Sequence, residues 1–117
     1  TFDVSGLSGT ITQVRIIWSH QVPGALSDDS VTISYGLTAY NDITANTYNS
    51  GNTPIDHMDV SSAVWEYYDA TSRRSGGGSW QWSDFTNLKV GGAYTKFKGS
   101  DSSFLLDAVG VEITYTP

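Results

Sequence analysis

The sequence predicts an all-β fold: a two-sheet antiparallel β-sandwich of jelly-roll-like topology, with seven or eight strands and one short helical turn. Several short segments alternate apolar and polar residues and are separated by turn residues, which is typical of strands. Charged residues make up only 15% of the chain, against about 25% in a typical domain, and 12 Gly and seven Tyr stand among many Ser, Thr and Asn. This composition favours strands and turns over long helices.

The length of 117 residues fits a single domain. We expect an extended N-terminal arm over residues 1–9, broken by Gly6 and Gly9, and one sandwich domain over residues 10–117. The chain begins with Thr1 rather than Met, so we expect either that a leader was removed or that the chain is part of a longer protein.

Two strands are predicted in the first part of the domain, over residues 10–18 and 31–37. In both segments apolar residues take alternate positions, which predicts one buried and one solvated face. The inward set is Val14, Ile16 and Trp18 in the first strand, and Val31, Ile33, Tyr35 and Leu37 in the second. The polar stretch 40–59 is interpreted either as two short strands or as a long loop around a turn.

Another strand is predicted over residues 60–69, followed by a flexible glycine loop tip at residues 75–78. After the loop, Ser83 is placed to cap one turn of 3₁₀ or α-helix over residues 84–87. Three apolar residues spaced by three accompany this turn, and we expect them to plug one end of the core: Trp82, Phe85 and Leu88.

The last part of the chain is predicted to be a hairpin. A strand over residues 90–97 begins at Gly91 and Gly92, which we interpret as a bulge, and residues 98–102 form the turn. The return strand, residues 106–115, has the clearest alternation. Its inward residues are Val109, Val111, Ile113 and Tyr115, and its outward residues are Gly110, Glu112 and Thr114.

Charge and composition exclude several function classes. The net charge is −6, and Arg73 and Arg74 form the sole adjacent basic pair, so we expect no nucleic-acid partner. No apolar run reaches the roughly 18 residues that a membrane span needs, so we expect no membrane insertion. The chain has no cysteine, which excludes disulfides and thiolate metal sites. We also expect no cofactor.

Four segments of the sequence carry a resemblance to known modules. The segments W-S-D-F-T-N-L-K-V-G and L-L-D-A-V-G-V-E-I-T-Y-T-P resemble the last third of small jelly-roll or β-sandwich modules. Such modules occur in bacteriophage virion proteins and in repetitive secreted or surface proteins of bacteria and archaea. The segments I-T-Q-V-R-I and D-D-S-V-T-I-S-Y-G resemble their first strands. The resemblance implies a virion or cell-surface role, often as an oligomer, and it supplies no catalytic residue.

Three sets of acidic residues are candidates for chemical sites. Asp56, His57 and Asp59 offer metal ligands or an acid–base set, but a strand points at most two of them together, and a polar strand edge is the favoured interpretation. The pair Asp28 and Asp29, with Asp101 or Asp107, offers oxygen ligands for calcium, yet an Asx turn explains the pair more simply.

Glu66 and Glu112 are the two glutamates of the chain and would be the natural pair for glycoside hydrolysis. A small sandwich without long loops makes a poor cleft for such a pair. The sequence also contains no nucleophile elbow, serine–histidine–aspartate signature or phosphate loop. We therefore expect that the protein is not an enzyme.

The strongest functional indication is a set of aromatic residues: Trp65, Tyr67, Tyr68 and Trp80. Within one strand Trp65 and Tyr67 share a face, while Tyr68 lies on the other face with Glu66. One face must be core, so the other exposes aromatic rings that would serve as an interface or as a platform on which sugars stack. The equally weighted alternative is that Trp65 and Trp82 are core residues and that the others cover the rim.

Three functions follow as hypotheses. The first is a non-enzymatic structural module of a virion or extracellular surface assembly, such as a capsid decoration, fibre or filament subunit. It would associate with copies of itself or with other virion or surface proteins through aromatic, low-charge surfaces, with the arm 1–9 reaching a neighbour. The second is a carbohydrate-binding module that stacks polysaccharide on Trp65, Tyr68 or Trp80. The third is a small glycosidase or lyase that uses Glu66 or Asp59.

Overall fold

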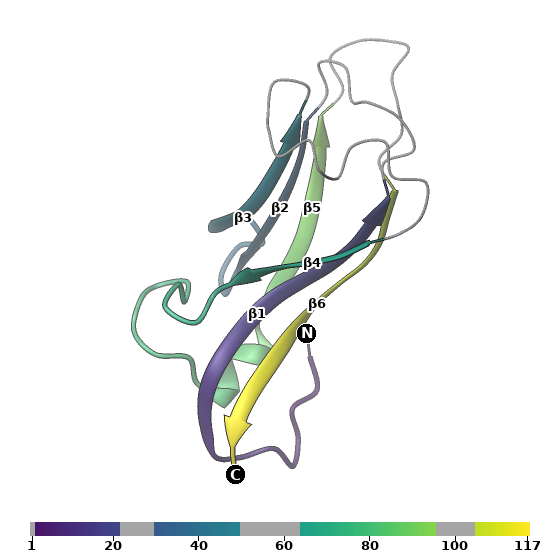
Figure 1. Cartoon of the computed structure of the whole chain (residues 1–117). Coiled ribbons are helices and arrows are strands. Elements are labelled where there is room, and N and C mark those ends of the chain that lie inside the picture. Colours follow the sequence, from purple (N-terminus) through teal and green to yellow (C-terminus); the bar gives the residue numbers. More distant parts are fainter. Residues whose placement is uncertain (1, 22–29, 50–63, 96–104) are drawn as a thin grey trace.

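The fold is a sandwich of two three-stranded antiparallel sheets (Figure 1). The computed structural model describes residues 2–21, 30–49, 64–95 and 105–117. In chain order the elements are β1 (Thr10–Gln21), β2 (Ser30–Gly36), β3 (Ile43–Asn49), β4 (Val64–Asp69), the 3₁₀ helix η2 (Trp82–Thr86), β5 (Lys89–Thr95) and β6 (Leu105–Thr116). The predicted all-β sandwich is confirmed. The predicted count of seven or eight strands is wrong, since the described residues form six.

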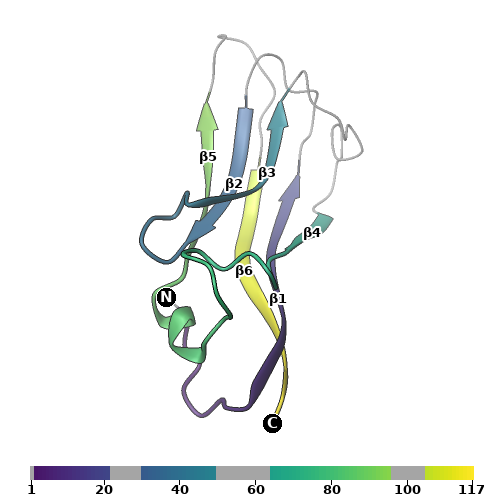
Figure 2. The same cartoon turned by 90° about the vertical axis from the view of Figure 1, so that its left-hand side faces the viewer.

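The strand order is β4-β1-β6 in one sheet and β3-β2-β5 in the other. Figure 2 shows the two sheets facing each other. Among the described strands, only β2 and β3 follow each other within one sheet, and every other pair of consecutive strands belongs to opposite sheets. Such crossings suit a jelly roll, but a jelly roll has eight strands, and six described strands are too few to assign that topology.

The core lies between the sheets and is built by the predicted alternation. The inward residues of β1 and β2 are all buried: Val14, Ile16, Trp18, Val31, Ile33 and Tyr35. Strand β6 supplies partners on the same face, because Ile16 lies opposite Val111 in the β1–β6 register. The predicted inward orientation of β6 is therefore confirmed by packing of Val109, Val111 and Ile113 against the core.

One end of the core is closed by η2, as predicted. Phe85 and Leu88 are fully buried, and Trp82 packs edge-on against Tyr115 at a centroid distance of 5.0 Å. The helix begins at Trp82 rather than at residue 84, and its cap is Gln81 rather than Ser83. The reason is that the carboxylate of Asp84 reaches back and accepts a hydrogen bond from the Gln81 backbone N–H at 2.7 Å.

The loop before η2 is tied down and is not a free tip. The Arg74 guanidinium donates to the carbonyl of Gly77 at 2.7 Å, and the Gly77 N–H donates to the carbonyl of Arg74 at 2.9 Å. Ser75 Oγ donates to Asp42 Oδ2 at 2.7 Å, which joins this loop to the turn between β2 and β3. The prediction of a flexible glycine tip missed these contacts because their partners, Arg74 and Asp42, lie outside the predicted tip.

Strand β5 differs from its prediction in two respects. The predicted hairpin of this strand with the return strand is wrong, because β5 pairs with β2 in one sheet and β6 pairs with β1 in the other. The register with β2 runs without a shift through Gly91 and Gly92, so the predicted glycine bulge is wrong. Gly91 instead lies beside the ring of Tyr40, where a Cβ would come within 3.5 Å of the Tyr40 side chain. Register shifts occur elsewhere, for example in β1 between Ile11 and Gln13. The predicted strand segments at 60–63 and 96–97 lie outside the described residues.

The N-terminal arm, residues 2–9, lies on its own domain. The Phe2 N–H donates to the carbonyl of Phe85 at 3.1 Å, and Phe2 and Val4 pack against the core. Gly9 joins the arm to β1 with φ of +112°, and a Cβ there would lie 2.2 Å from the Thr116 carbonyl oxygen. The described arm thus covers part of the sandwich.

Candidate functional site

The candidate site lies on the outer face of the β4-β1-β6 sheet. Ile16 and Trp18 of β1 point inward, so the residues between and beside them point outward. The β1–β4 register places Ile17 opposite Tyr67 and Ser19 opposite Trp65 on this outer face. Both aromatic side chains are open to solvent, with exposed fractions of 65% for Trp65 and 58% for Tyr67.

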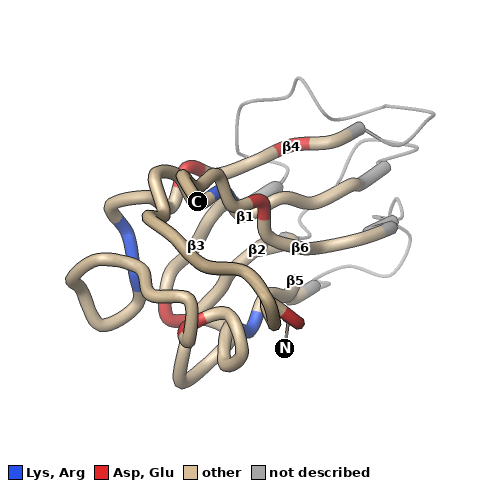
Figure 3. Tube along the Cα trace, turned by 90° about the horizontal axis from the view of Figure 1, so that it is seen from below, with Lys and Arg blue, Asp and Glu red and all other residues tan. Residues whose placement is uncertain are grey.

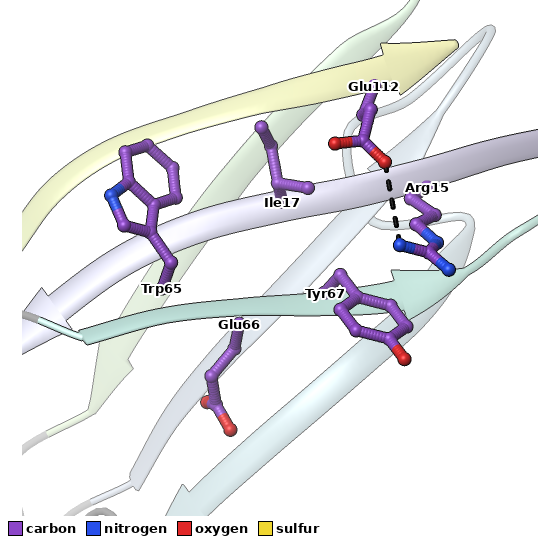
Figure 4. A pocket seen from close by; sticks show the side chains of 6 residues that line it. All are labelled: Arg15, Ile17, Trp65, Glu66, Tyr67 and Glu112. Carbon is purple, nitrogen blue, oxygen red and sulfur yellow. Dashed lines mark ion pairs between the residues drawn. The ribbon is translucent and has the colours of Figure 1, made fainter. Parts of the chain in front are cut away.

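A shallow hollow of about 250 Å³ occupies this face. Its lining residues are Arg15, Ile17, Trp65, Glu66, Tyr67 and Glu112. Figure 4 shows the Trp65 and Tyr67 rings on the same side of β4, whereas the Glu66 side chain points the other way. Gly110 lies opposite Ile17 in the neighbouring strand β6 and adds no side chain there, so the floor of the hollow stays low.

Arg15 organises the polar part of the site. Its Nη1 lies 3.5 Å from Glu112 Oε1, and its guanidinium carbon lies 4.2 Å from the centroid of the Tyr67 ring. The second contact is a cation–π interaction, which restrains both side chains. Arg15 Nε is buried and has no hydrogen-bond partner within the described residues. Arg15 is therefore held by stacking on Tyr67 and by Glu112 rather than by a hydrogen bond at Nε.

A second carboxylate lies beside the same guanidinium. In the registers of the sheet, Arg15 is directly opposite Asp69 of β4 on one side and Glu112 of β6 on the other. Hydrogen bonds from Thr71 are the main cause that lowers the pKa of Asp69, and Arg15 adds a smaller electrostatic contribution. The outer face thus carries two carboxylates around one guanidinium, a local charge of −1.

The aromatic residues predicted for the site divide into two groups. Trp65 and Tyr67 come together on the outer face, as their alternation predicted, so the alternative that Trp65 is a core residue is wrong. Tyr68 lies on the inner face, where its ring centroid is 6.1 Å from that of Tyr35.

Trp80 is not part of a platform. It is only 6% exposed, its ring stacks on Phe85 at a centroid distance of 5.4 Å, and its Nε1 donates to the Ala70 carbonyl at 2.7 Å. Alternation did not apply to this residue because it lies in the connection before η2 and not in a strand. Its assignment as an exposed aromatic is therefore wrong.

Sequence reasoning did not place Arg15, Ile17 or Glu112 beside the aromatic residues, although Glu112 was considered as a catalytic carboxylate. Each was correctly predictable as an outward residue from the alternation of its own strand. What the sequence does not reveal is that β1 lies between β4 and β6, since the three strands are far apart along the chain. Their juxtaposition depends on the strand order and not on any local pattern.

The described residues bring together neither a cluster of metal ligands nor the two glutamates. Within them, no group of three or more His, Cys, Asp or Glu side chains could hold a metal ion. Glu66 lies opposite the inward residue Trp18, whereas Glu112 lies opposite the outward residue Arg15, so the two glutamates occupy opposite faces of the sheet. The candidates Asp28, Asp29, Asp56, His57, Asp59 and Asp101, and the side chain of Asp107, lie outside the described residues.

Family models, curated proteins and solved structures were compared with the chain, and none of them matches it. The resemblance to virion and surface modules therefore stays a prediction. In the part of the chain that the structure describes, no helix is long and apolar enough to cross a membrane.

Proposed function

We propose that this chain is a non-enzymatic carbohydrate-binding module of a virion or cell-surface assembly, whose ligand stacks on Trp65 and Tyr67. The observation that carries the proposal is the pair of large aromatic side chains that β4 exposes on one face, beside a hollow and an ion pair. A soluble domain rarely leaves such rings uncovered side by side unless something binds them.

The surface of a sugar ring is chemically complementary to the aromatic face formed by Trp65 and Tyr67. A pyranose ring presents an apolar face of C–H groups, and an aromatic ring presents a negative π face, so the two stack with burial of apolar area. The hydroxyl groups at the sugar's edge need donors and acceptors. Arg15 supplies donors and Glu112 supplies acceptors at the margin of the hollow.

The shape of the site favours a segment of a longer glycan. The hollow of about 250 Å³ is smaller than the roughly 300–1,000 Å³ of pockets that enclose a small molecule. It lies on an open sheet face, so a polysaccharide chain is able to enter and leave at both ends. A short stretch of sugar units would contact Trp65 and Tyr67 while the rest of the polymer stays in solvent.

A second candidate is the self-associating structural module of a virion or extracellular assembly. It is favoured by the same exposed rings and by the low density of charge, which leaves most of the described chain free of Lys, Arg, Asp and Glu (Figure 3). A stable interface between copies buries about 1,200 Å² or more in total, so Trp65 and Tyr67 would be the centre of a larger contact. In this case the partner on the outer face is a second copy.

Affinity electrophoresis in native gels that contain a panel of polysaccharides tests the first candidate. We expect at least one polysaccharide to retard the wild type, and Trp65→Ala to abolish that retardation. Tyr40→Ala is the matched control, because Tyr40 is an exposed aromatic residue (45%) away from this sheet. Absence of retardation by every polysaccharide would contradict the proposal. Light scattering then distinguishes the second candidate, which requires an oligomer that Trp65→Ala dissociates.

A further inference from the structure

We infer that the outer face selects uncharged glycans and rejects glycans that carry carboxylate or sulfate groups, with Glu112 as the residue that sets this selectivity. The inference rests on the proposed function and specifies its substrate class. It depends on the contacts of Arg15, which is the only cation among the described residues that line the hollow.

A carboxylate residue flanks Arg15 on each of the two neighbouring strands. It lies on the central strand of the sheet, directly opposite Asp69 on one side and Glu112 on the other. One terminal nitrogen is 3.5 Å from Glu112, and the guanidinium carbon is 4.2 Å from the centroid of the Tyr67 ring. An anionic sugar that approached Arg15 would therefore meet two carboxylates around one guanidinium, and would have to displace Glu112 to gain an ion pair.

The same arrangement accepts a hydroxyl group without being broken. A hydroxyl both donates and accepts, so one sugar hydroxyl is able to donate to Glu112 while it accepts from Arg15. A sugar carboxylate only accepts, so it gains nothing from Glu112 and is repelled by it. Figure 4 shows the Arg15–Glu112 pair on the side of the hollow next to Tyr67, and Trp65 at its other end. A ring stacked on the aromatics would bring its edge groups to this pair.

The charge of the whole molecule acts in the same direction. The net charge is −6, which lowers the local concentration of polyanions near the surface at low ionic strength. A like charge at about 4 Å in water costs about fivefold in affinity, and salt screens the part that comes from distant charges. The discrimination should therefore be strongest at low salt and should decrease as salt is added.

The test compares one polysaccharide before and after partial carboxymethylation, so that the sugar backbone is the same. The neutral polymer is the one that retards the wild type most strongly. Affinities are measured by electrophoresis in 20 mM and in 500 mM salt, where the electrostatic screening length is about 20 Å and about 4 Å, respectively. We expect the carboxymethylated polymer to bind at least about fivefold more weakly at low salt.

The variant Glu112→Gln removes one of the two carboxylates while keeping the size of the side chain. The ratio of its affinity for the carboxymethylated polymer to its affinity for the neutral polymer should be about fivefold higher than in the wild type. Asp3→Asn is the matched control: it makes the same change in net charge on the exposed arm, outside the hollow.

The outcomes separate the two proposals. Equal binding of the neutral and carboxymethylated polymers, both lost in Trp65→Ala, would overturn the inference and leave the proposed function standing. A gain in binding of the charged polymer that is as large in Asp3→Asn as in Glu112→Gln would also overturn it, because the effect would then come from total charge. If only charged polymers are retarded, the inference is overturned and the proposed function stands. If no polysaccharide, neutral or charged, is retarded, the proposed function fails, and the inference fails with it.

Discussion

Arg74 and Asp84 form a two-point contact across the connection between β4 and β5. Arg74 Nε donates to Asp84 Oδ2 at 2.8 Å, and Nη2 donates to Oδ1 at 2.9 Å. The Asp84 side chain is 8% exposed, and its Oδ2 also accepts the Gln81 N–H at 2.7 Å. One carboxylate therefore fixes the start of η2 and the glycine loop together, which positions the plug of the core.

We expect Asp84→Asn to lower the free energy of unfolding by about 3 kcal/mol. Removing one partner of a largely buried ion pair costs roughly 3–5 kcal/mol because the other charge is left unpaired, and Arg74 retains some access to water, so the lower end applies. Urea unfolding measures the change. Asp3→Asn, on the exposed arm, is the control and should stay within about 0.5 kcal/mol of the wild type. Equal stability of the two variants would contradict this role.

Acid should weaken the fold partly through the same pair. The hydrogen bonds from Arg74 are the main cause that lowers the pKa of Asp84, and its unfolded value is about 3.9. A folded pKa below the unfolded one means that the stabilisation is complete well above pH 4 and is lost as pH falls through the folded pKa. We expect stability to fall between about pH 5 and pH 2.

Urea unfolding of the wild type and of Asp84→Asn at pH 7, 5 and 3 checks this dependence. The variant should lose less stability on acidification, although some loss should remain. Asp42 and Asp69 retain lowered pKa values, which hydrogen bonds from Ser75 and Thr71 mainly cause. Parallel pH profiles for the wild type and the variant would show that Asp84 makes no contribution.

Alternation in the sequence was sufficient to predict the sandwich and the faces of its strands. The inward sets of β1, β2 and β6 are as predicted because a period of two directly reports which side of a strand is buried. The separation of Trp65 and Tyr67 from Tyr68 follows from the same rule. The plug formed by Phe85 and Leu88 was predictable from their spacing of three.

What could not be predicted depends on contacts between distant segments. The hollow exists because β1 lies between β4 and β6, which brings Arg15 beside both Tyr67 and Glu112. Trp80 was misassigned because its burial comes from Phe85 and Ala70, and no local period describes a residue in a connection. The bulge expected at Gly91 was wrong because glycine is compatible with a regular ladder as well as with a bulge.

Truncation of Trp80 should lower the free energy of unfolding much more than truncation of Trp65. Trp80→Ala removes a buried ring that stacks on Phe85 and leaves a cavity, so it should cost about 3–5 kcal/mol of unfolding free energy. Trp65→Ala removes a ring that is 65% exposed and should cost less than about 1 kcal/mol. Thermal or urea unfolding of both variants gives the comparison. A large loss in Trp65→Ala would mean that this ring stabilises the fold, and the binding test on that variant would then need Tyr67→Ala instead.

Two glycines of the described chain should differ sharply when replaced by alanine. At Gly36 an added Cβ would lie 1.8 Å from the carbonyl oxygen of Ala39. That turn is tied by Thr38 Oγ1 donating to Asp42 Oδ2 at 3.1 Å. At Gly77 φ is +79° and nothing lies within 4 Å of the added atom, so only backbone strain opposes the change.

We therefore expect Gly36→Ala to cost about 3 kcal/mol or more, since overpacking at a fixed backbone forces the turn to move. Gly77→Ala should cost about 1–2 kcal/mol, the penalty for a left-handed conformation with a Cβ. Urea unfolding of both variants measures the difference, and circular dichroism verifies that each still folds. A larger loss of stability in Gly77→Ala than in Gly36→Ala would contradict this expectation. It would mean that the turn after β2 moves to accept the new Cβ in spite of the hydrogen bond from Thr38 to Asp42. The close approach at Gly36 would then not be what determines that turn.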